Sequence, residues 1–276
     1  YALEIQRPEY GVGFDGVMRA RAGALTGILN GIDTDVWNPS ADVHLPAPYT
    51  AKTLAAKQQS KRAVLDAFGL PVDDASLARP LAGIVSRLVD QKGFDLVAQV
   101  AEPLVDAGAA FVVLGSGDGR YEHLWRVLAA RRPSTVGVHI GFDERLAHLV
   151  EAGADLFLMP SRYEPCGLNQ MYSQRYGTVP VVRATGGLVD SVTPWNPETK
   201  TGTGFLFADY SGDALLAAFH AALETFGRPA EWKKLQQNGM KADFSWDRSA
   251  RAYVTVYKRV IAARRARRPK AGKARA

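Results

Sequence analysis

The chain has 276 residues, of which 47% are hydrophobic and 22% charged. These proportions are those of an ordinary globular protein and exclude a fibrous repeat and a chain disordered throughout. The formal charge of +6 could suggest a nucleic-acid partner, but nine basic residues and no acidic one lie between residue 258 and the end. The remainder has 25 basic and 28 acidic residues, which argues against a nucleic-acid-binding fold.

Cysteine, histidine and apolar residues narrow the class of protein further. The single Cys166 excludes an internal disulfide framework and is typical of a reducing compartment, so we expect a cytoplasmic protein. The five histidines have no Cys or His neighbour at metal-ligand spacing, and we expect no metal site. No run approaches the roughly 18 apolar residues of a membrane helix, so we expect no membrane partner.

Residues 1–78 show no regular pattern and include a Pro-rich connection over residues 38–50. Between residues 79 and 207, short β-rich apolar runs alternate with helical patterns, which predicts a parallel sheet built from βαβ units. The predicted strands are Leu81 to Val85, Ala110 to Leu114, Val136 to Ile140, Leu156 to Met159, Val179 to Val182 and Gly204 to Phe207. Helices are predicted near 93–107, 120–131, 143–152 and 168–176. We therefore expect an α/β fold with a doubly wound, Rossmann-like sheet.

The last third of the chain predicts C-terminal helices. They cover Asp213 to Phe226, Ala230 to Asn238 and Trp246 to Ala263. The basic stretch that follows, residues 264–276, is predicted to be a solvated, disordered tail.

In doubly wound sheets, ligands bind beyond the carboxyl ends of the strands. Arg87 directly follows the first predicted strand, and Lys92 comes five residues later, just before Gly93. Two cations at one strand end suit a diphosphate, because Arg can bind two oxygens in a fork and Lys adds a point charge. The alternative is an ordinary Arg and Lys in a surface loop.

The second and third strands end in less specific features. The second runs into "LGSGDG", whose glycine spacing departs from the dinucleotide fingerprint, so the turn is a weak indication of a NAD site. Its alternative role is a tight turn that lets the backbone pass close to a ligand or a neighbouring helix. Phe142 follows the third strand and could stack on a base or belong to the core or its rim.

The ends of the fourth and fifth strands combine an acidic side chain with backbone donors. Glu164 lies in a loop bracketed by Pro160 and Pro165, and a helix begins nearby at Gly167. A carboxylate beside free N–H groups suits the hydroxyls of a sugar, with helix capping by Glu164 as the alternative. After the fifth strand, a Thr-Gly-Gly turn over residues 185–187 opens a short predicted helix and exposes amides that suit a phosphate.

Five stretches together resemble one family. They are "NGIDTDVWNP" (30–39), "SRLVDQKGFDL" (86–96), "MPSRYEPCGLNQMY" (159–172), "YGTVPVVRATGGLVDSV" (176–192) and "TGTGFLF" (201–207). In this order they resemble the bacterial glycogen synthases and plant starch synthases, which are retaining glucosyltransferases of the two-domain GT-B architecture. The resemblance implies transfer of glucose from ADP-glucose to the non-reducing end of an α-1,4-glucan, without a cofactor or metal.

The resemblance also assigns roles to residues. Arg87 and Lys92 would be catalytic, binding the donor phosphates and stabilising the leaving diphosphate. Glu164 would contact the glucosyl hydroxyls, and Phe142 would stack on adenine. Backbone contacts to sugar or phosphate are implied for Cys166, Gly167, Leu168, Thr185, Gly186 and Gly187. Many GT-B relatives carry a ribose-binding Glu at the position of Tyr172. The glycogen and starch synthase branch is similar to this sequence in lacking that Glu.

The family's members begin with a second Rossmann-like domain, which this sequence lacks. We therefore interpret residues 1–25 as the end of that domain and the crossover, 26–245 as the nucleotide-sugar-binding domain, and 246–263 as a C-terminal helix. The chain would bind the donor but be inactive without the N-terminal domain as its partner. The alternatives are a free-standing, non-catalytic nucleotide- or glucan-binding module, and a UDP-glucose enzyme, which "EPCGLNQMY" disfavours.

Overall fold

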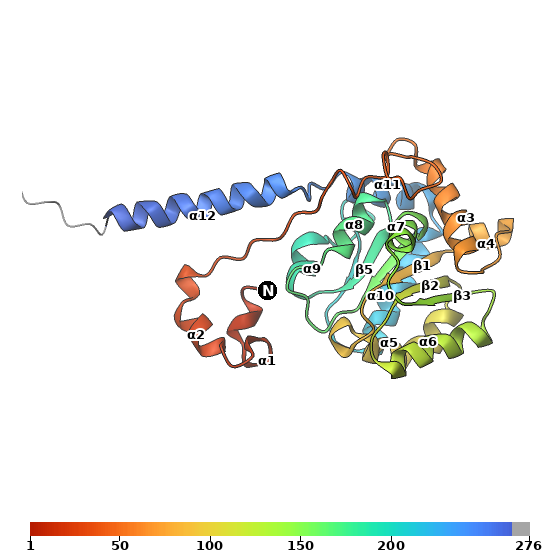
Figure 1. Ribbon diagram of the computed structural model, residues 1–276, viewed down its shortest axis with the longest axis horizontal. Coiled ribbons are helices and arrows are strands. Elements are labelled where there is room, and N and C mark those ends of the chain that lie inside the picture. Colours follow the sequence, from red (N-terminus) through yellow and green to blue (C-terminus); the bar gives the residue numbers. More distant parts are fainter. Residues whose placement is uncertain (267–276) are drawn as a thin grey trace, which may run out of the picture.

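The computed structural model of the chain, which describes residues 1–266, is built around a parallel sheet of six strands in the order β3-β2-β1-β4-β5-β6 (Figure 1). The strands are β1 (Leu81–Val85), β2 (Ala110–Gly115), β3 (Val136–Ile140), β4 (Leu156–Met159), β5 (Val179–Arg183) and β6 (Phe205–Phe207). All six predicted strands are confirmed to within one residue. The strand order is that of the doubly wound Rossmann architecture, so the predicted fold class is confirmed.

Both faces of the sheet are covered by helices, which explains why the strands are apolar along their whole length. In β2, Phe111 and Val113 belong to one buried cluster, while Val112 and Leu114 belong to another on the opposite face. The first face packs against α5 (Phe94–Asp106), α6 (Gly119–Arg131) and α10 (Gly212–Phe226). The second face packs against α3 (Lys57–Ala67) and α7 (Glu144–Gly153). Alternate side chains thus face opposite layers.

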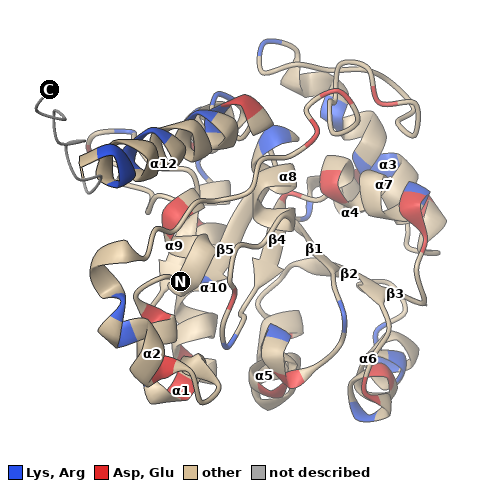
Figure 2. Ribbon diagram, turned by 60° about the vertical axis from the view of Figure 1, so that its left-hand side comes forward, with Lys and Arg blue, Asp and Glu red and all other residues tan. Residues whose placement is uncertain are grey.

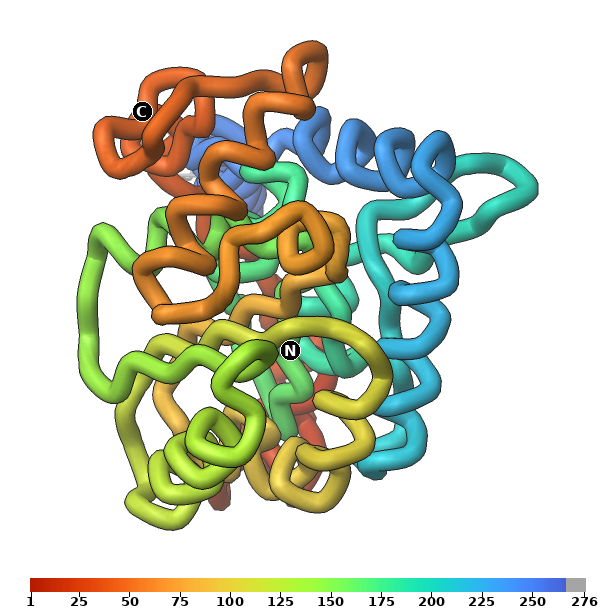
Figure 3. The backbone as a smooth tube through the Cα atoms, turned by 90° about the vertical axis from the view of Figure 1, so that its right-hand side faces the viewer, coloured from red at the N-terminus to blue at the C-terminus, as the bar shows by residue number. Residues whose placement is uncertain are grey.

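The helices of the last two thirds lie where they were predicted. They include α8 (Asn169–Arg175), α9 (Gly186–Ser191), α11 (Pro229–Met240) and α12 (Trp246–Ala266). Figure 3 shows α10 running along one side of the molecule and α11 turning away from its end. The predicted end of the last helix at Ala263 was too early, because α12 continues to Ala266. The rest of the predicted basic tail, residues 267–276, lies outside the described residues.

Residues 1–78 contain helices that the sequence pattern did not indicate, including α3 and α4 (Asp74–Ala78). The physical reason is visible in α3, whose buried residues include Lys57, Ser60 and Lys61 beside Val64 and Leu65. Because three of these five buried side chains are polar, the helical repeat of apolar residues that would have indicated α3 is incomplete.

Two parts of the chain lie outside the sheet domain. One comprises residues 1–24, with α1 (Pro8–Gly11) and α2 (Asp15–Ala20), and the other is α12, which projects away from the sheet (Figure 1). The start of α12 is bonded to the stretch that follows residues 1–24, because the Ser249 hydroxyl donates to the Leu29 carbonyl (2.7 Å). Lys and Arg recur along α12 (Figure 2), and no described helix combines the length and apolar character needed to cross a membrane.

Candidate active site

A pocket of ≈ 220 Å³ lies at the carboxyl ends of β1 and β4. From β1 the sheet continues to β2 and β3 on one side and to β4 on the other, so this is the point where the strand order reverses. Such a switch point leaves a crevice in which doubly wound proteins bind ligands. The polar residues that line the pocket are Ser86, Arg87, Lys92, Ser161 and Asn169.

A cation and a carboxylate meet at this pocket. Lys92 ends the short helix η4 (Asp90–Lys92), and Glu164 lies in the loop after β4. The Lys92 Nζ is 2.6 Å from Glu164 Oε2, which also accepts a hydrogen bond from the Ser161 hydroxyl at 3.1 Å. The side chain of Lys92 is 22% exposed and that of Glu164 is 7% exposed. The pair is therefore largely removed from water yet remains open at the lysine.

The loops that carry this pair pack closely together at Gly93. Its φ of +80° lies in the left-handed region that glycine adopts without strain. A Cβ at this position would clash with the Pro160 carbonyl oxygen. The glycine thus lets the loop after β4 approach the start of α5, which brings Glu164 within reach of Lys92.

Arg87 is exposed, lines the same pocket as Lys92 and is oriented by Gln91. Its guanidinium donates to Gln91 Oε1 at 3.1 Å. The Gln91 amide in turn donates to the Tyr163 carbonyl (2.9 Å), and the Gln91 carbonyl accepts from Arg162 N (2.9 Å). Within residues 1–266 no carboxylate forms an ion pair with Arg87, so its charge is available to an anionic ligand. Gln91, which the sequence analysis did not identify, connects the loops after β1 and β4.

The loop between Glu164 and α8 presents backbone donors. The carbonyls of Cys166 and Gly167 both accept from the Gln170 side chain at 3.1 Å. In the part of the chain that the structure describes, the N–H groups of Cys166, Gly167 and Leu168 have no protein acceptor. Burial raises the pKa of the Cys166 thiol, so this thiol is neutral at pH 7. Free donors next to a carboxylate can bind several hydroxyls of one ligand.

The Thr-Gly-Gly turn is engaged within the protein. Thr185 Oγ1 and Gly186 N donate to the same oxygen of Glu4, at 3.0 and 2.8 Å. Gly187 N donates to the Glu164 carbonyl at 2.8 Å. Both glycine amides therefore have protein acceptors in this structure. The sequence analysis missed Glu4, because nothing in the pattern around residue 4 indicates a partner 181 positions away.

The two other predicted strand-end features lie apart from the pocket. Phe142 follows β3 and is 87% exposed, and it is not among the residues that line the pocket. The "LGSGDG" turn runs against the loop after β1, since Leu88 N donates to the Ser116 carbonyl (2.9 Å) and Asp118 N to the Leu88 carbonyl (2.8 Å). The backbone of this turn therefore packs closely against the loop after β1, and not against a neighbouring helix as one alternative had it.

A second set of side chains that was not predicted from the sequence supports the loops after β4, β5 and β6. Asp95 accepts from Arg162 (2.6 Å) and from the Tyr210 hydroxyl (2.5 Å). The guanidinium carbons of Arg162 and Arg183 lie 4.8 and 5.1 Å from the centre of the Tyr210 ring. Arg183 also donates to the Arg162 carbonyl at 2.6 Å. Cation–π contacts and hydrogen bonds thus hold the backbone just before Glu164.

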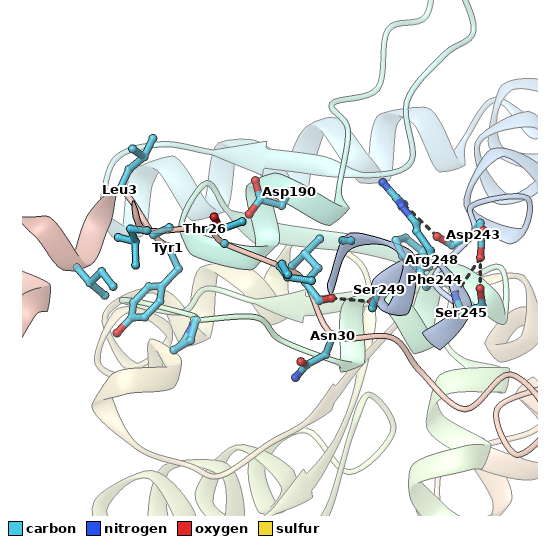
Figure 4. A pocket seen from close by; sticks show the side chains of 18 residues that line it. Tyr1, Leu3, Thr26, Asn30, Asp190, Asp243, Phe244, Ser245, Arg248 and Ser249 are labelled. Atoms are coloured by element: carbon cyan, nitrogen blue, oxygen red, sulfur yellow. Dashed lines mark hydrogen bonds between the residues drawn. The ribbon is translucent and has the colours of Figure 1, made fainter. Parts of the chain in front are cut away.

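A larger cavity of ≈ 690 Å³ lies where residues 1–5 and 25–30 face α9 and the start of α12 (Figure 4). Lys92 and Glu164 are not among the residues that line it. Arg248 binds the Asp243 carbonyl (3.0 Å), and Ser249 binds the Leu29 carbonyl (2.7 Å). We therefore place the candidate site at the strand ends and regard this cavity as a gap between two packed segments.

A Rossmann-like sheet with an ion pair and free donors at its switch point defines an α/β domain of the kind that binds nucleotides and related ligands. The chain matches the family described as "Glycosyl transferases group 1" over residues 74–239. It therefore belongs to the group 1 glycosyltransferases.

Comparison with known proteins gives more specific relatives. The chain is 53% identical to a glycogen synthase from Koribacter versatilis and 50% identical to one from Alkalilimnicola ehrlichii, in each case over 94% of this chain and 53% of the relative. A solved structure of the catalytic domain of starch synthase IV from Arabidopsis thaliana, bound to ADP and acarbose, superposes with a TM-score of 0.86 and 35% identity. The match covers 95% of this chain and 54% of that one. The chain thus spans about half the length of these relatives.

Proposed function

We propose that this chain is the donor-binding part of a glycogen synthase, which transfers glucose from ADP-glucose to the non-reducing end of an α-1,4-glucan with retention. Glycogen synthases at 53% and 50% identity and the starch synthase structure support this proposal. The observation that carries it is that Arg87 and Lys92, the latter paired with Glu164, line one pocket at the switch point of the sheet. We also propose that the enzyme acts in the cytoplasm.

The proposed chemistry follows from these charges. When the bond between glucose and the diphosphate breaks, negative charge grows on the departing oxygen. The Arg87 guanidinium has no carboxylate partner within residues 1–266 and can bind this charge in a fork, and Lys92 can add a second positive charge from the same strand end. We propose that these two cations, and no metal ion or other cofactor, compensate the charge. The Glu164 carboxylate and the amides of Cys166, Gly167 and Leu168 would bind the glucosyl hydroxyls.

Four further residues, Phe142 and the turn over residues 185–187, are predicted to contact the donor. Phe142 is exposed at the end of β3 and free to stack on adenine. The side chain of Thr185 and the amides of Gly186 and Gly187 have protein partners, so direct contacts from them to the donor would require a rearrangement of this turn.

The glucan acceptor and the second domain belong to the proposal as well. Tyr253, Tyr257, Val260 and Ile261 on α12 are at least 42% exposed, which is typical of an apolar surface that meets another part of a protein. We propose that α12 and residues 1–24 face an N-terminal domain. Because transfer needs a closed cleft that excludes water, we expect the chain alone to bind the donor without elongating glycogen.

Calorimetric titration with ADP, UDP and ADP-glucose tests the proposal. We expect Arg87→Ala and Lys92→Ala to weaken the binding of ADP and ADP-glucose by about tenfold or more, since each removes a charge-assisted contact. Arg131→Ala and Lys233→Ala remove exposed charges at a distance from the pocket and should bind as the wild type does. Equal binding by the wild type and both pocket variants would overturn the assignment of the phosphate site.

The same titration separates the alternatives. Tighter binding of UDP than of ADP would contradict the choice of donor. Glycogen elongation by the 276-residue chain alone would show that this chain is active by itself. Donor binding that persists when the chain is joined to an N-terminal domain, still without transfer, would favour a non-catalytic binding module.

A further inference from the structure

The N-terminal segment, residues 1–24, forms hydrogen bonds to the sheet domain through one side chain within the described residues. It folds into α1, α2 and the short helices η1 (Glu4–Gln6) and η2 (Ala22–Ala24), and lies on the side of the molecule that carries α9 (Figures 1 and 2). In the described chain, all hydrogen bonds between this segment and residues 31–266 end on the Glu4 carboxylate. A further contact is the approach of the Tyr10 and Tyr163 rings, whose centres are 6.2 Å apart.

The groups that bind Glu4 are connected to the candidate site. Thr185 and Gly186, which donate to Glu4 Oε1, precede Gly187, whose N–H donates to the backbone carbonyl of Glu164. Gly186 packs so closely on that carbonyl that a Cβ there would clash with it, and the same Cβ would lie 3.5 Å from Glu4 Oε2. The turn is therefore held by Glu4 on one side and supports the backbone of Glu164 on the other.

We propose that Glu4 is a positioning residue of the active site. By holding the turn over residues 185–187, it fixes the backbone of Glu164 and so orients the carboxylate toward the sugar of the donor. The inference rests on the proposed function, because it takes a sugar nucleotide as the ligand. Glu4 already occupies Thr185 Oγ1 and Gly186 N, so the diphosphate is left to Arg87 and Lys92.

This role predicts a difference between two ligands. ADP carries the nucleotide and the diphosphate but not the glucose, so its binding should not depend on how Glu164 is oriented. ADP-glucose requires that orientation. General damage to the fold would weaken the binding of both ligands. If Glu4 merely blocked a phosphate site, removing its carboxylate would make both ligands bind more tightly.

The first experiment compares calorimetric titrations of ADP and ADP-glucose with the wild type, Glu4→Ala, Glu4→Gln and the control Glu9→Ala. Glu9 lies exposed in the same segment. We expect Glu4→Ala to weaken the binding of ADP-glucose about tenfold and to leave the binding of ADP unchanged, as the loss of a charge-assisted acceptor implies. Glu4→Gln keeps an accepting oxygen and should recover most of the affinity. Unchanged or tighter binding of ADP-glucose by Glu4→Ala would overturn the proposal.

A second measurement needs no ligand. The amide hydrogen of Gly187 is protected by its bond to Glu164, so its exchange rate reports whether the turn is held. We expect this hydrogen to exchange about tenfold faster in Glu4→Ala and at the wild-type rate in Glu9→Ala. Unchanged exchange in Glu4→Ala would overturn the inference. If wild-type protein failed to bind ADP-glucose, the proposed function would fail, while the exchange result would still decide whether Glu4 holds the turn.

Discussion

Two lysine–carboxylate pairs lie at opposite edges of the sheet and have nearly the same length. Lys92 and Glu164 are 2.6 Å apart at the carboxyl edge, and Lys61 and Asp155 are 2.7 Å apart at the amino edge. Their surroundings differ, since the side chain of Lys61 is 3% exposed and that of Lys92 is 22% exposed. Both members of the Lys61–Asp155 pair have further partners in the protein, because Lys61 also donates to the Arg79 carbonyl and Asp155 also accepts from Leu81 N.

This difference shows how burial separates a structural ion pair from one that can bind a ligand. At the amino edge, α3 is fastened to the sheet by Lys61 and, one turn earlier, by Lys57. The Lys57 amine donates to the Ala152 carbonyl (2.5 Å) and to Thr178 Oγ1 (2.7 Å). At the carboxyl edge, Lys92 lines a pocket together with Arg87, which forms no ion pair with any described residue. Lysines at the two edges should therefore respond differently to the same substitution.

The largest effect is expected at the amino edge. Lys61→Met would leave the Asp155 carboxylate buried without its cation, which typically costs about 3 kcal/mol or more of unfolding free energy. Urea unfolding measures this loss, with Lys52→Met at an exposed position as the matched control. A loss no larger than that of the control would show that the two edges are not distinguished by burial.

Lys57 should make stability depend on pH. Burial lowers the pKa of its amine from 10.5 to about 7, so the unfolded chain binds the proton more strongly than the folded chain between these values. Stability should therefore increase as the pH rises from 7 to 9, by about 2 kcal/mol from this residue. Urea unfolding at both pH values should show the increase in the wild type and a smaller one in Lys57→Met. The same slope in both proteins would contradict the role of Lys57.

At the carboxyl edge, the same Lys→Met substitution should affect the binding of ADP more than the stability of the fold. We expect Lys92→Met to cost about 2 kcal/mol of unfolding free energy, less than Lys61→Met, because Lys92 is more exposed than Lys61 and Glu164, although buried, keeps its bond from Ser161. Urea unfolding compares this variant with Lys61→Met, and calorimetry with ADP measures its loss of binding. A loss of stability as large as that of Lys61→Met would remove the distinction between the edges.

The smallest effect is expected for an ion pair on the surface. Arg131 and Glu102 are 3.2 Å apart, but their side chains are 67% and 45% exposed. Water screens such pairs, so Arg131→Ala should change the unfolding free energy by less than about 0.5 kcal/mol. A chevron or urea titration beside Lys61→Met would complete the series from buried to exposed. A large loss here would mean that exposure does not rank these pairs.

The sequence by itself determined most of the secondary structure of residues 79–263 and the strand ends that carry charged residues. Fully buried strands must be apolar throughout, so Leu81–Val85 and its counterparts stand out as short β-rich runs. Arg87, Lys92 and Glu164 could be selected because ligand-binding residues of doubly wound sheets follow their strands. Helix α3 escaped this reasoning, since Lys57 and Lys61 occupy positions where the pattern requires apolar residues.

Only the tertiary structure decided which of these residues meet. Lys92 and Glu164 are 72 positions apart and come together because β4, and not β2 alone, lies beside β1. The bond between Glu4 and Thr185 spans 181 positions and joins a segment outside the sheet to the turn before α9. Periodicity and spacing report on neighbours within one element, whereas strand order and loop packing place distant residues side by side, and these depend on the whole fold.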